Sequence, residues 1–286
     1  MAVATITFAD RLAAEVERKH SQLVVGLDPN VDLLPIELRG DVARFCCGIV
    51  DAVAPHAVAV KPQLAFFEAL GPAGIAAFDQ VCQYAKRAGL LVIADGKRGD
   101  IGSTARAYSE AYIEGNPPRA DALTVNPWLG RDSVEPFLGA VRRGGVGIFV
   151  LVRTSNSSGD LQDAVLKDGR PMWHHVAELV DEWGAETAGE TGLSSVGAVV
   201  GATHPRVVAE ARRLMPRTIM LLPGVGAQGA AVSDLTRAFQ SGPASAVVAA
   251  SRSVIYAFKD AGTDYREAAG AEAARLKREI WAASGW

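Results

Sequence analysis

Residues 90–104 read LLVIADGKRGDIGST, and in this stretch a buried strand runs into a cluster of charges. The run 90–94 is aliphatic without polar alternation, which is typical of a strand covered on both faces. Side chains two apart on a strand point to the same side, so Asp95 and Lys97 are expected to face one way. Gly96 and Gly99 allow a sharp turn after the strand. The four ionisable residues that follow the run are Asp95, Lys97, Arg98 and Asp100.

The same alternation of strand and helix patterns extends outward in both directions. Strands are expected at 23–28, 57–64, 90–94, 122–126, 147–153, 196–201, 219–222 and 246–250. A leading helix is expected at 8–19, and Ser103 is expected to cap a later helix at 104–113. The other helices are expected at 41–53, 71–88, 132–143, 172–186, 205–215, 231–240 and 265–282.

Eight strand-helix units with no linker between them predict an α/β fold, a single (β/α)8 TIM barrel over residues 1–286 with an extra N-terminal helix. The alternative is an open, doubly wound sheet. That fold usually carries a glycine-rich dinucleotide loop after its first strand, and Gly26-Leu-Asp-Pro29 is not one.

Composition narrows the class of function. The 286 residues are 49% apolar and 21% charged, with a formal net charge of −3, so the chain has no basic footprint for nucleic acid or a membrane surface. The longest apolar runs, about eight residues, are too short to cross a bilayer, and the first residues do not resemble a secretory signal. Three cysteines form neither a disulfide framework nor a zinc pattern. We therefore expect a cytoplasmic protein.

Polar residues collect where the expected strands end, and active sites of barrels lie at the carboxyl ends of their strands. Lysines interleaved with carboxylates there would offset the repulsion between the carboxylates and hold the charges rigidly. The residues at these ends are Asp28, Lys61, Asp95, Lys97, Asn126, Thr154, Ser155, Gln228 and Arg252.

A second pattern indicates an anion site. The segment Pro223-Gly-Val-Gly-Ala-Gln-Gly229 follows the seventh expected strand, and Arg252 follows the eighth. Backbone N–H groups of Gly224, Gly226 and Gly229 could cradle a phosphate, as the loops after strands seven and eight of barrels often do. The arginine would add a charge-assisted contact.

The motif Asp95-Gly-Lys-Arg-Gly-Asp-Ile101, with Lys61 one unit earlier, resembles the signature of orotidine 5′-phosphate decarboxylases. The likeness covers essentially the whole chain and is strongest to the longer bacterial branch of that family. It implies decarboxylation of orotidine 5′-monophosphate to UMP in pyrimidine biosynthesis, with no cofactor and no metal. It also implies a homodimer with shared active sites.

The resemblance further implies a role for each matching residue. Lys97 would be the general acid at C6 of the pyrimidine, Asp95 would face the substrate carboxylate, and Lys61 would bridge the network and touch the ribose. The remaining roles would be ribose binding by Asp28, the pyrimidine edge by Ser155, phosphate by Gln228 and Arg252, and contacts to the partner's site by Asp100, Ile101 and Thr104.

Two other functions remain possible from the sequence. One is a metal-dependent phosphosugar decarboxylase of the same superfamily, but those enzymes have an acidic residue where this chain has Lys61. The other is a catalytically silent barrel that binds a nucleotide. The charged positions that the resemblance requires are all present, which argues against it.

Overall fold

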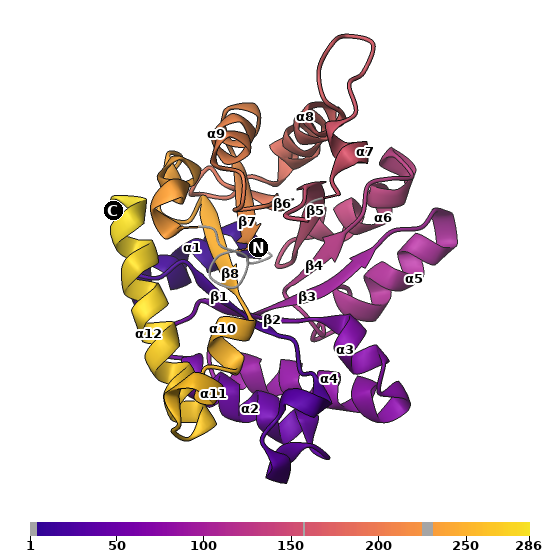
Figure 1. Cartoon of the computed structure of the whole chain (residues 1–286). Coiled ribbons are helices and arrows are strands. Elements are labelled where there is room, and N and C mark those ends of the chain that lie inside the picture. The colour runs from indigo at the N-terminus through magenta and orange to yellow at the C-terminus, as the bar shows by residue number, and fades with distance from the viewer. Residues whose placement is uncertain (1–4, 157, 225–230) are drawn as a thin grey trace.

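Eight parallel strands close into a barrel in chain order, and the last strand pairs with the first (Figure 1). The computed structural model describes residues 5–156, 158–224 and 231–286. The strands are β1 (Leu23–Leu27), β2 (Ala59–Pro62), β3 (Leu91–Arg98), β4 (Ala122–Val125), β5 (Gly147–Arg153), β6 (Ser194–Val200), β7 (Thr218–Pro223) and β8 (Ala246–Ala250).

Helices surround the barrel (Figure 1). The longer ones are α1 (Phe8–Lys19), α2 (Val42–Val53), α4 (Gly71–Arg87), α5 (Gly102–Tyr112), α6 (Arg131–Arg142), α8 (Met172–Gly184), α9 (Pro205–Leu214) and α12 (Tyr265–Ser284). The short helices are α3 (Leu64–Glu68), α7 (Asp160–Asp163), α10 (Arg252–Ile255) and α11 (Phe258–Ala261). The 3-10 helices are η1 (Val31–Leu33), η2 (Ile36–Leu38), η3 (Ala185–Thr187) and η4 (Val232–Phe239).

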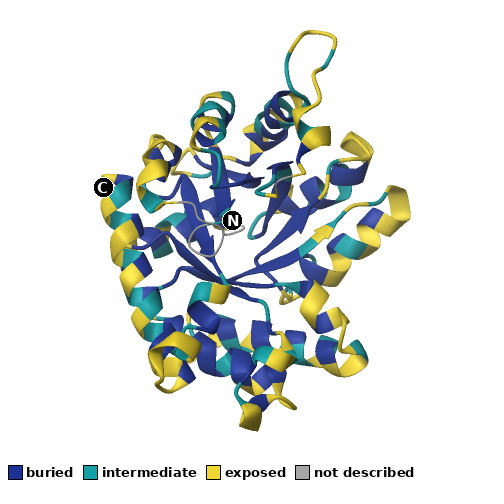
Figure 2. Cartoon of the chain, in the orientation of Figure 1, coloured by how far each residue is buried: buried dark blue, intermediate teal, exposed yellow. Residues whose placement is uncertain are grey.

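The burial of each element explains its sequence pattern (Figure 2). Every residue of β1, β2, β4, β6 and β8 is buried, because helices cover the outside of the barrel and side chains fill its interior. The surrounding helices bury one face and expose the other, so their apolar residues recur at helical spacing. The core therefore has two layers, one inside the barrel and one between barrel and helices.

The leading helix α1 covers the amino-terminal end of the barrel. Its Phe8 ring packs edge-on against Phe149 of β5, with ring centroids 6.0 Å apart, and the Ala9 N–H donates to Ser195 Oγ at 3.2 Å. Leu12 and Val16, one and two turns further along, are fully buried against the same interior cluster. Helix α1 therefore covers the interior of the barrel at this end.

The predicted (β/α)8 barrel with its N-terminal helix is confirmed, and the bounds of α1, β5 and β8 agree with those expected. The helix expected at 104–113 begins two residues earlier, and Ser103 does not cap it. The segment expected as a helix at 231–240 is a 3-10 helix, and α3, α7, α10 and α11 were not expected. In the described part of the chain, no helix combines the length and the hydropathy needed to cross a membrane.

Candidate active site

A cavity of about 410 Å³ opens at the carboxyl ends of the barrel strands. Loops and strand ends from around the whole barrel contribute to its wall. Its polar lining residues are Asp28, Lys61, Gln63, Asp95, Lys97, Thr124, Thr154, Ser155, Asn156, Ser251 and Arg252.

The Asp95 carboxylate, only 5% exposed, is the centre of this cluster. Its Oδ2 atom accepts hydrogen bonds from Lys61 Nζ at 2.6 Å and from Gln63 Nε2 at 3.1 Å. Its Oδ1 atom accepts from Lys97 Nζ at 2.5 Å and from Thr124 Oγ1 at 3.0 Å. Two cations and two neutral donors therefore hold this carboxylate in one orientation.

The charges in this cluster stabilise one another. Burial by itself raises the pKa of the Asp95 carboxyl, but the attraction of Lys61 and Lys97 outweighs it and holds that pKa well below its usual value. Burial also disfavours the ammonium of Lys61, yet Asp95 and then Asp28 raise its pKa above the usual value. Both members of the buried pair therefore stay charged around neutral pH.

Strand β3 bulges where it carries these charges. Ala94 pairs with Leu123 and Arg98 with Val125, so four steps along β3 match two steps along β4. Lys97 lies in the bulge with a backbone φ of 46°, in the left-handed region that non-glycine residues seldom occupy. Its side chain is 43% exposed and points its ammonium back to the buried carboxylate.

Asp28 follows β1, the strand that pairs with β2 beside Lys61, and it is held by its backbone. The Tyr256 hydroxyl donates to the Asp28 carbonyl oxygen at 2.8 Å and accepts from the Asn30 N–H at 2.7 Å. Burial raises the pKa of this phenol to about 12, so it remains a donor. Asp28 Oδ1 is buried without a hydrogen-bond partner among the described residues. A bound ligand with a hydroxyl could supply the missing donor.

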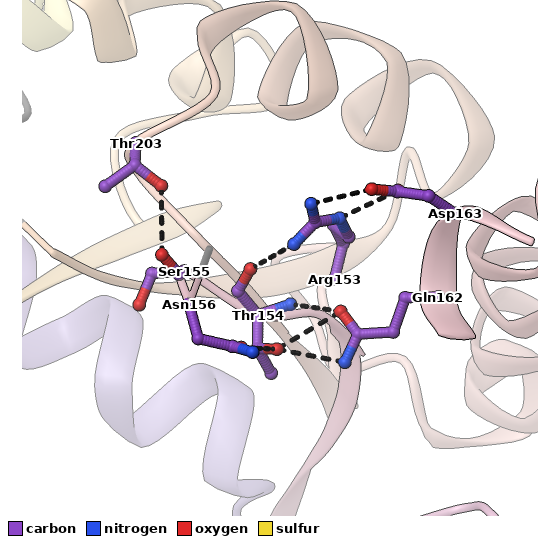
Figure 3. A network of polar contacts seen from close by, with 7 residues as sticks. All are labelled: Arg153, Thr154, Ser155, Asn156, Gln162, Asp163 and Thr203. Carbon is purple, nitrogen blue, oxygen red and sulfur yellow. Dashed lines mark hydrogen bonds and ion pairs between the residues drawn. The ribbon is translucent and has the colours of Figure 1, made fainter. Parts of the chain in front are cut away.

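The loop that follows β5 is held in place by two sets of hydrogen bonds, made by Arg153 and by Gln162 (Figure 3). Buried Arg153 donates to both oxygens of Asp163, at 2.9 and 2.8 Å, and to the Thr154 carbonyl at 2.6 Å. Gln162 Oε1 accepts from the Thr154 N–H at 2.8 Å. These bonds join the short helix α7 to the end of β5, and Ser155 lies at the cavity wall.

The expected phosphate site is described in part. Gly224, with a φ of 107°, and Arg252 both line the cavity. The guanidinium of Arg252 is exposed, and it has no hydrogen-bond or ion-pair partner in the described ranges. Three other expected residues, Gly226, Gln228 and Gly229, lie outside the described residues.

Three residues expected at the site do not line the cavity of their own chain. Ile101 and Thr104 are exposed at the start of α5, and Asp100 is half-buried just before them. Asp100 Oδ1 accepts the Ile101 N–H at 2.8 Å. Within one chain the charged cluster therefore comprises two lysines and Asp95, without Asp100.

The sequence reasoning missed Gln63 and Thr124, which both bond to Asp95, and it placed Asn126 at the rim instead. Asn126 is exposed and caps the loop by accepting the Trp128 N–H at 3.0 Å. Thr124, two residues earlier, is the inward-facing polar residue of β4. The missed signal for Gln63 was its place two residues after Lys61, on the same side of the chain.

A larger cavity, of about 760 Å³, lies at the amino ends of the strands beside α1. Its charged groups are already paired: Arg11 bonds Asp121 at 2.6 Å, and Lys86 donates to the Pro118 carbonyl at 2.6 Å. Among the described residues, no three His, Cys, Asp or Glu side chains are grouped to hold a metal ion. We therefore place the candidate active site in the smaller cavity, where charges converge and strands end.

The fold and the site together define a class, a (β/α)8-barrel enzyme with a lysine-aspartate-lysine centre beside an arginine-bearing rim. Residues 21–268 match the model of the Orotidine 5'-phosphate decarboxylase / HUMPS family. The chain belongs to the orotidine 5′-phosphate decarboxylase family and is a carboxy-lyase that converts orotidine 5′-monophosphate to UMP and CO₂ in pyrimidine biosynthesis.

Individual relatives agree with this assignment. The orotidine 5′-phosphate decarboxylase of Rhodopirellula baltica is 46% identical over 271 residues, which cover 89% of this chain and 90% of the relative. That of Deinococcus radiodurans is 46% identical over 257 residues, covering 88% and 90%. A crystal structure from Streptomyces avermitilis, assigned to the same activity, superimposes with a TM-score of 0.85 at 38% identity and covers 99% of this chain and 98% of its own.

Proposed function

We propose that Lys97 is the general acid of the decarboxylation, within a charge network of Lys61, Asp95, Lys97 and Asp100. The observation that supports this best is the pair of ammonium groups at 2.6 and 2.5 Å from the two oxygens of buried Asp95. One lysine of the pair is buried, whereas Lys97 is part-exposed at the cavity and can meet a substrate.

The chemistry explains why an ammonium is needed there. When the bond to CO₂ breaks, its electron pair stays on C6 in the plane of the ring, where the π-system cannot delocalise it. Lys97 donates its proton to that pair to form the C6–H bond, and the neutral amine regains a proton from water. Because charge is more concentrated at C6 than on the starting carboxylate, the fixed ammonium binds the transition state more strongly than the substrate.

The size of this effect is chemically useful. At an effective dielectric near 20, unit charges about 4 Å apart attract by roughly 4 kcal/mol, which corresponds to about a thousandfold in rate. The cluster is preorganised, so little reorganisation is needed during the reaction. Asp95, kept ionised, would also repel the substrate carboxylate, and we assign that ground-state effect a secondary part.

The other side chains of the cavity would bind the rest of the nucleotide. Asp28 would accept from ribose hydroxyls, which is supported by its buried oxygen without a partner among the described residues. Lys61 would touch the ribose and Ser155 would bond the pyrimidine edge. The phosphate would be held by Arg252, Gln228 and the loop that contains Gly224, Gly226 and Gly229.

Asp100, Ile101 and Thr104 would act in the site of a partner subunit, so we propose an obligate homodimer. Ile101 is 58% exposed, and Trp128 and Leu129 on the next loop of the rim are 62% and 54% exposed. Large apolar side chains exposed together favour an interface. Lys61 and Lys97 both pair with the single carboxylate of Asp95, and Asp100 of a partner would add a second carboxylate to this cluster.

Four further properties belong to this proposal. Residues 1–286 form one domain, the chain works in the cytoplasm, it needs neither a cofactor nor a metal, and it does not bind nucleic acid. The net charge of −3 supports the last of these.

A decarboxylation assay in excess EDTA tests the proposed metal-free mechanism. The loss of orotidine 5′-monophosphate is followed by pyrimidine absorbance, with and without added Mg²⁺. We expect equal rates in both. Turnover that requires Mg²⁺ would instead indicate a metal-dependent mechanism, and tight UMP binding without any turnover would indicate a silent barrel.

A further inference from the structure

Thr124 lies opposite the bulge that carries the catalytic lysine. It is the one β4 residue between Leu123, which pairs with Ala94, and Val125, which pairs with Arg98. Three β3 residues, 95–97, therefore face this single position. The side chain of Thr124 is buried, 1% exposed, and it lines the active-site cavity.

The Thr124 hydroxyl uses both of its hydrogen-bonding capacities on Lys97 and its partner. A backbone N–H can only donate, so Thr124 Oγ1 accepts from the Lys97 N–H, at 2.9 Å. The single hydroxyl proton is then donated to Asp95 Oδ1 at 3.0 Å. That same oxygen accepts from Lys97 Nζ at 2.5 Å. One hydroxyl and one carboxylate oxygen thus tie Lys97 at both its backbone and its ammonium.

This closed arrangement accounts for the unusual backbone of Lys97. Its φ of 46° is costly for a residue with a Cβ and persists only where the surroundings over-determine it. In the bulge its N–H has lost the partner that a regular parallel ladder would provide. Thr124 Oγ1 is that partner. Without it, the N–H would lose its protein partner, and the backbone would relax toward an ordinary conformation.

We propose that Thr124 is a positioning residue that sets the Lys97 ammonium at the reacting carbon. The inference rests on the proposed role of Lys97 as the general acid. A displacement of about 1 Å in a reacting group lowers rates by about a hundredfold, so a threonine can control turnover through the position of Lys97. Its effect falls on kcat, because ground-state binding of the nucleotide depends on other side chains.

Thr124→Val and Thr124→Ser separate the hydroxyl from the shape of the side chain. Valine keeps the shape and loses both hydrogen bonds, whereas serine keeps the hydroxyl. We expect T124V to lower kcat about tenfold to a hundredfold, with KM and UMP affinity within about threefold of wild type, and T124S to recover most of the loss. Thr218→Val is the matched control, since Thr218 begins β7 at the far end of the barrel, is fully buried, and its hydroxyl has no partner among the described residues.

The outcomes distinguish this inference from the proposed function. If T124V keeps wild-type kcat while Lys97→Ala abolishes turnover, the positioning role is wrong and the general acid stands. If Lys97→Ala retains turnover, both are wrong. If T124V lowers UMP affinity as much as kcat, or T124S does not restore kcat, Thr124 acts only in structure. Should T124V not fold, Thr124→Cys replaces it with the same expectations, because a thiol fits the space but hydrogen-bonds weakly.

Discussion

At the scale of single residues, the Asp95 carboxylate organises the site because it accepts from four donors. A buried carboxylate is tolerated only when its charge is compensated. The two lysines compensate it, and their own positions are fixed in return. The groups that we propose to perform the chemistry are thus also the groups that make one another's burial possible.

Lys97→Ala is expected to lower kcat by at least about a thousandfold, because it removes the ammonium that we propose meets the developing charge. Binding of UMP should be retained, since Asp28, Ser155 and Arg252 remain. Turnover followed by absorbance and UMP affinity by calorimetry check this. Comparable losses of kcat and of UMP affinity would contradict the assignment.

Asp95→Asn is expected to change how stability depends on pH. The folded-state pKa of Asp95 lies below the unfolded value of 3.8, so its ion pairs contribute stability above that value, and the contribution is lost as pH falls through the lower folded pKa. The variant should be less stable than wild type by about 3 kcal/mol between pH 5 and 8, because it leaves buried Lys61 unpaired.

Urea unfolding at fixed protein concentration measures this difference. The difference in the free energy of unfolding should narrow as the pH falls below about 4. If the free energies of unfolding of the two proteins differ by the same amount down to pH 2, the protonation of Asp95 is not linked to folding.

At the scale of elements, buried Arg212 links α9 to the segments that precede β7 and β8 through hydrogen bonds. Its guanidinium donates to backbone carbonyls of several segments and has no carboxylate partner among the described residues. Burial lowers the pKa of Arg212 to about 10, so it remains protonated at neutral pH. The accepting carbonyls belong to Met215, Pro216, Thr218, Ala238 and Ser245.

Arg212→Met is expected to lower the free energy of unfolding by about 3 kcal/mol or more, because buried carbonyl groups lose their donor. Arg213→Met is the control, since the Arg213 side chain is 70% exposed and, among the described residues, pairs only with Glu210, at 3.6 Å. The control should stay within about 0.5 kcal/mol of wild type. Equal unfolding midpoints for the two variants in denaturant would refute the role of Arg212.

At the scale of the whole molecule, α1 covers one end of the barrel, and the polar residues of the candidate site lie at the other end. Asp100, Ile101 and Thr104 lie on this open end but outside the cavity of their own chain. We therefore propose that these residues act in the site of a second chain. In a homodimer, each chain would lend them to the other.

Mixing an Asp100→Ala protein with a Lys97→Ala protein is expected to restore activity that neither has alone. Random exchange makes half of the dimers hybrid, and each hybrid carries one intact site, so about a quarter of wild-type activity should return. Mass analysis of tagged subunits verifies the exchange. Proven exchange without activity would exclude the shared site.

The sequence by itself determined the alternation of elements and the family of the site, because both depend on local patterns. A strand buried on both faces must be continuously apolar, as 90–94 is, and a helix on a barrel must repeat its apolar residues about every 3.6 positions. The motif Asp95-Gly-Lys97 could be recognised from the sequence because its residues lie close together in the chain.

Only the tertiary structure decided which polar residues meet. Pairing between β3 and β4 creates the bulge, and the bulge turns Thr124 toward Lys97 while Asn126 stays outside. The direction in which these side chains point depends on the register between strands that are about 30 residues apart in the chain. No local sequence pattern encodes that register. The short helices α3, α7, α10 and α11 also escaped prediction, because a single turn is stabilised by contacts to the barrel rather than by its own sequence.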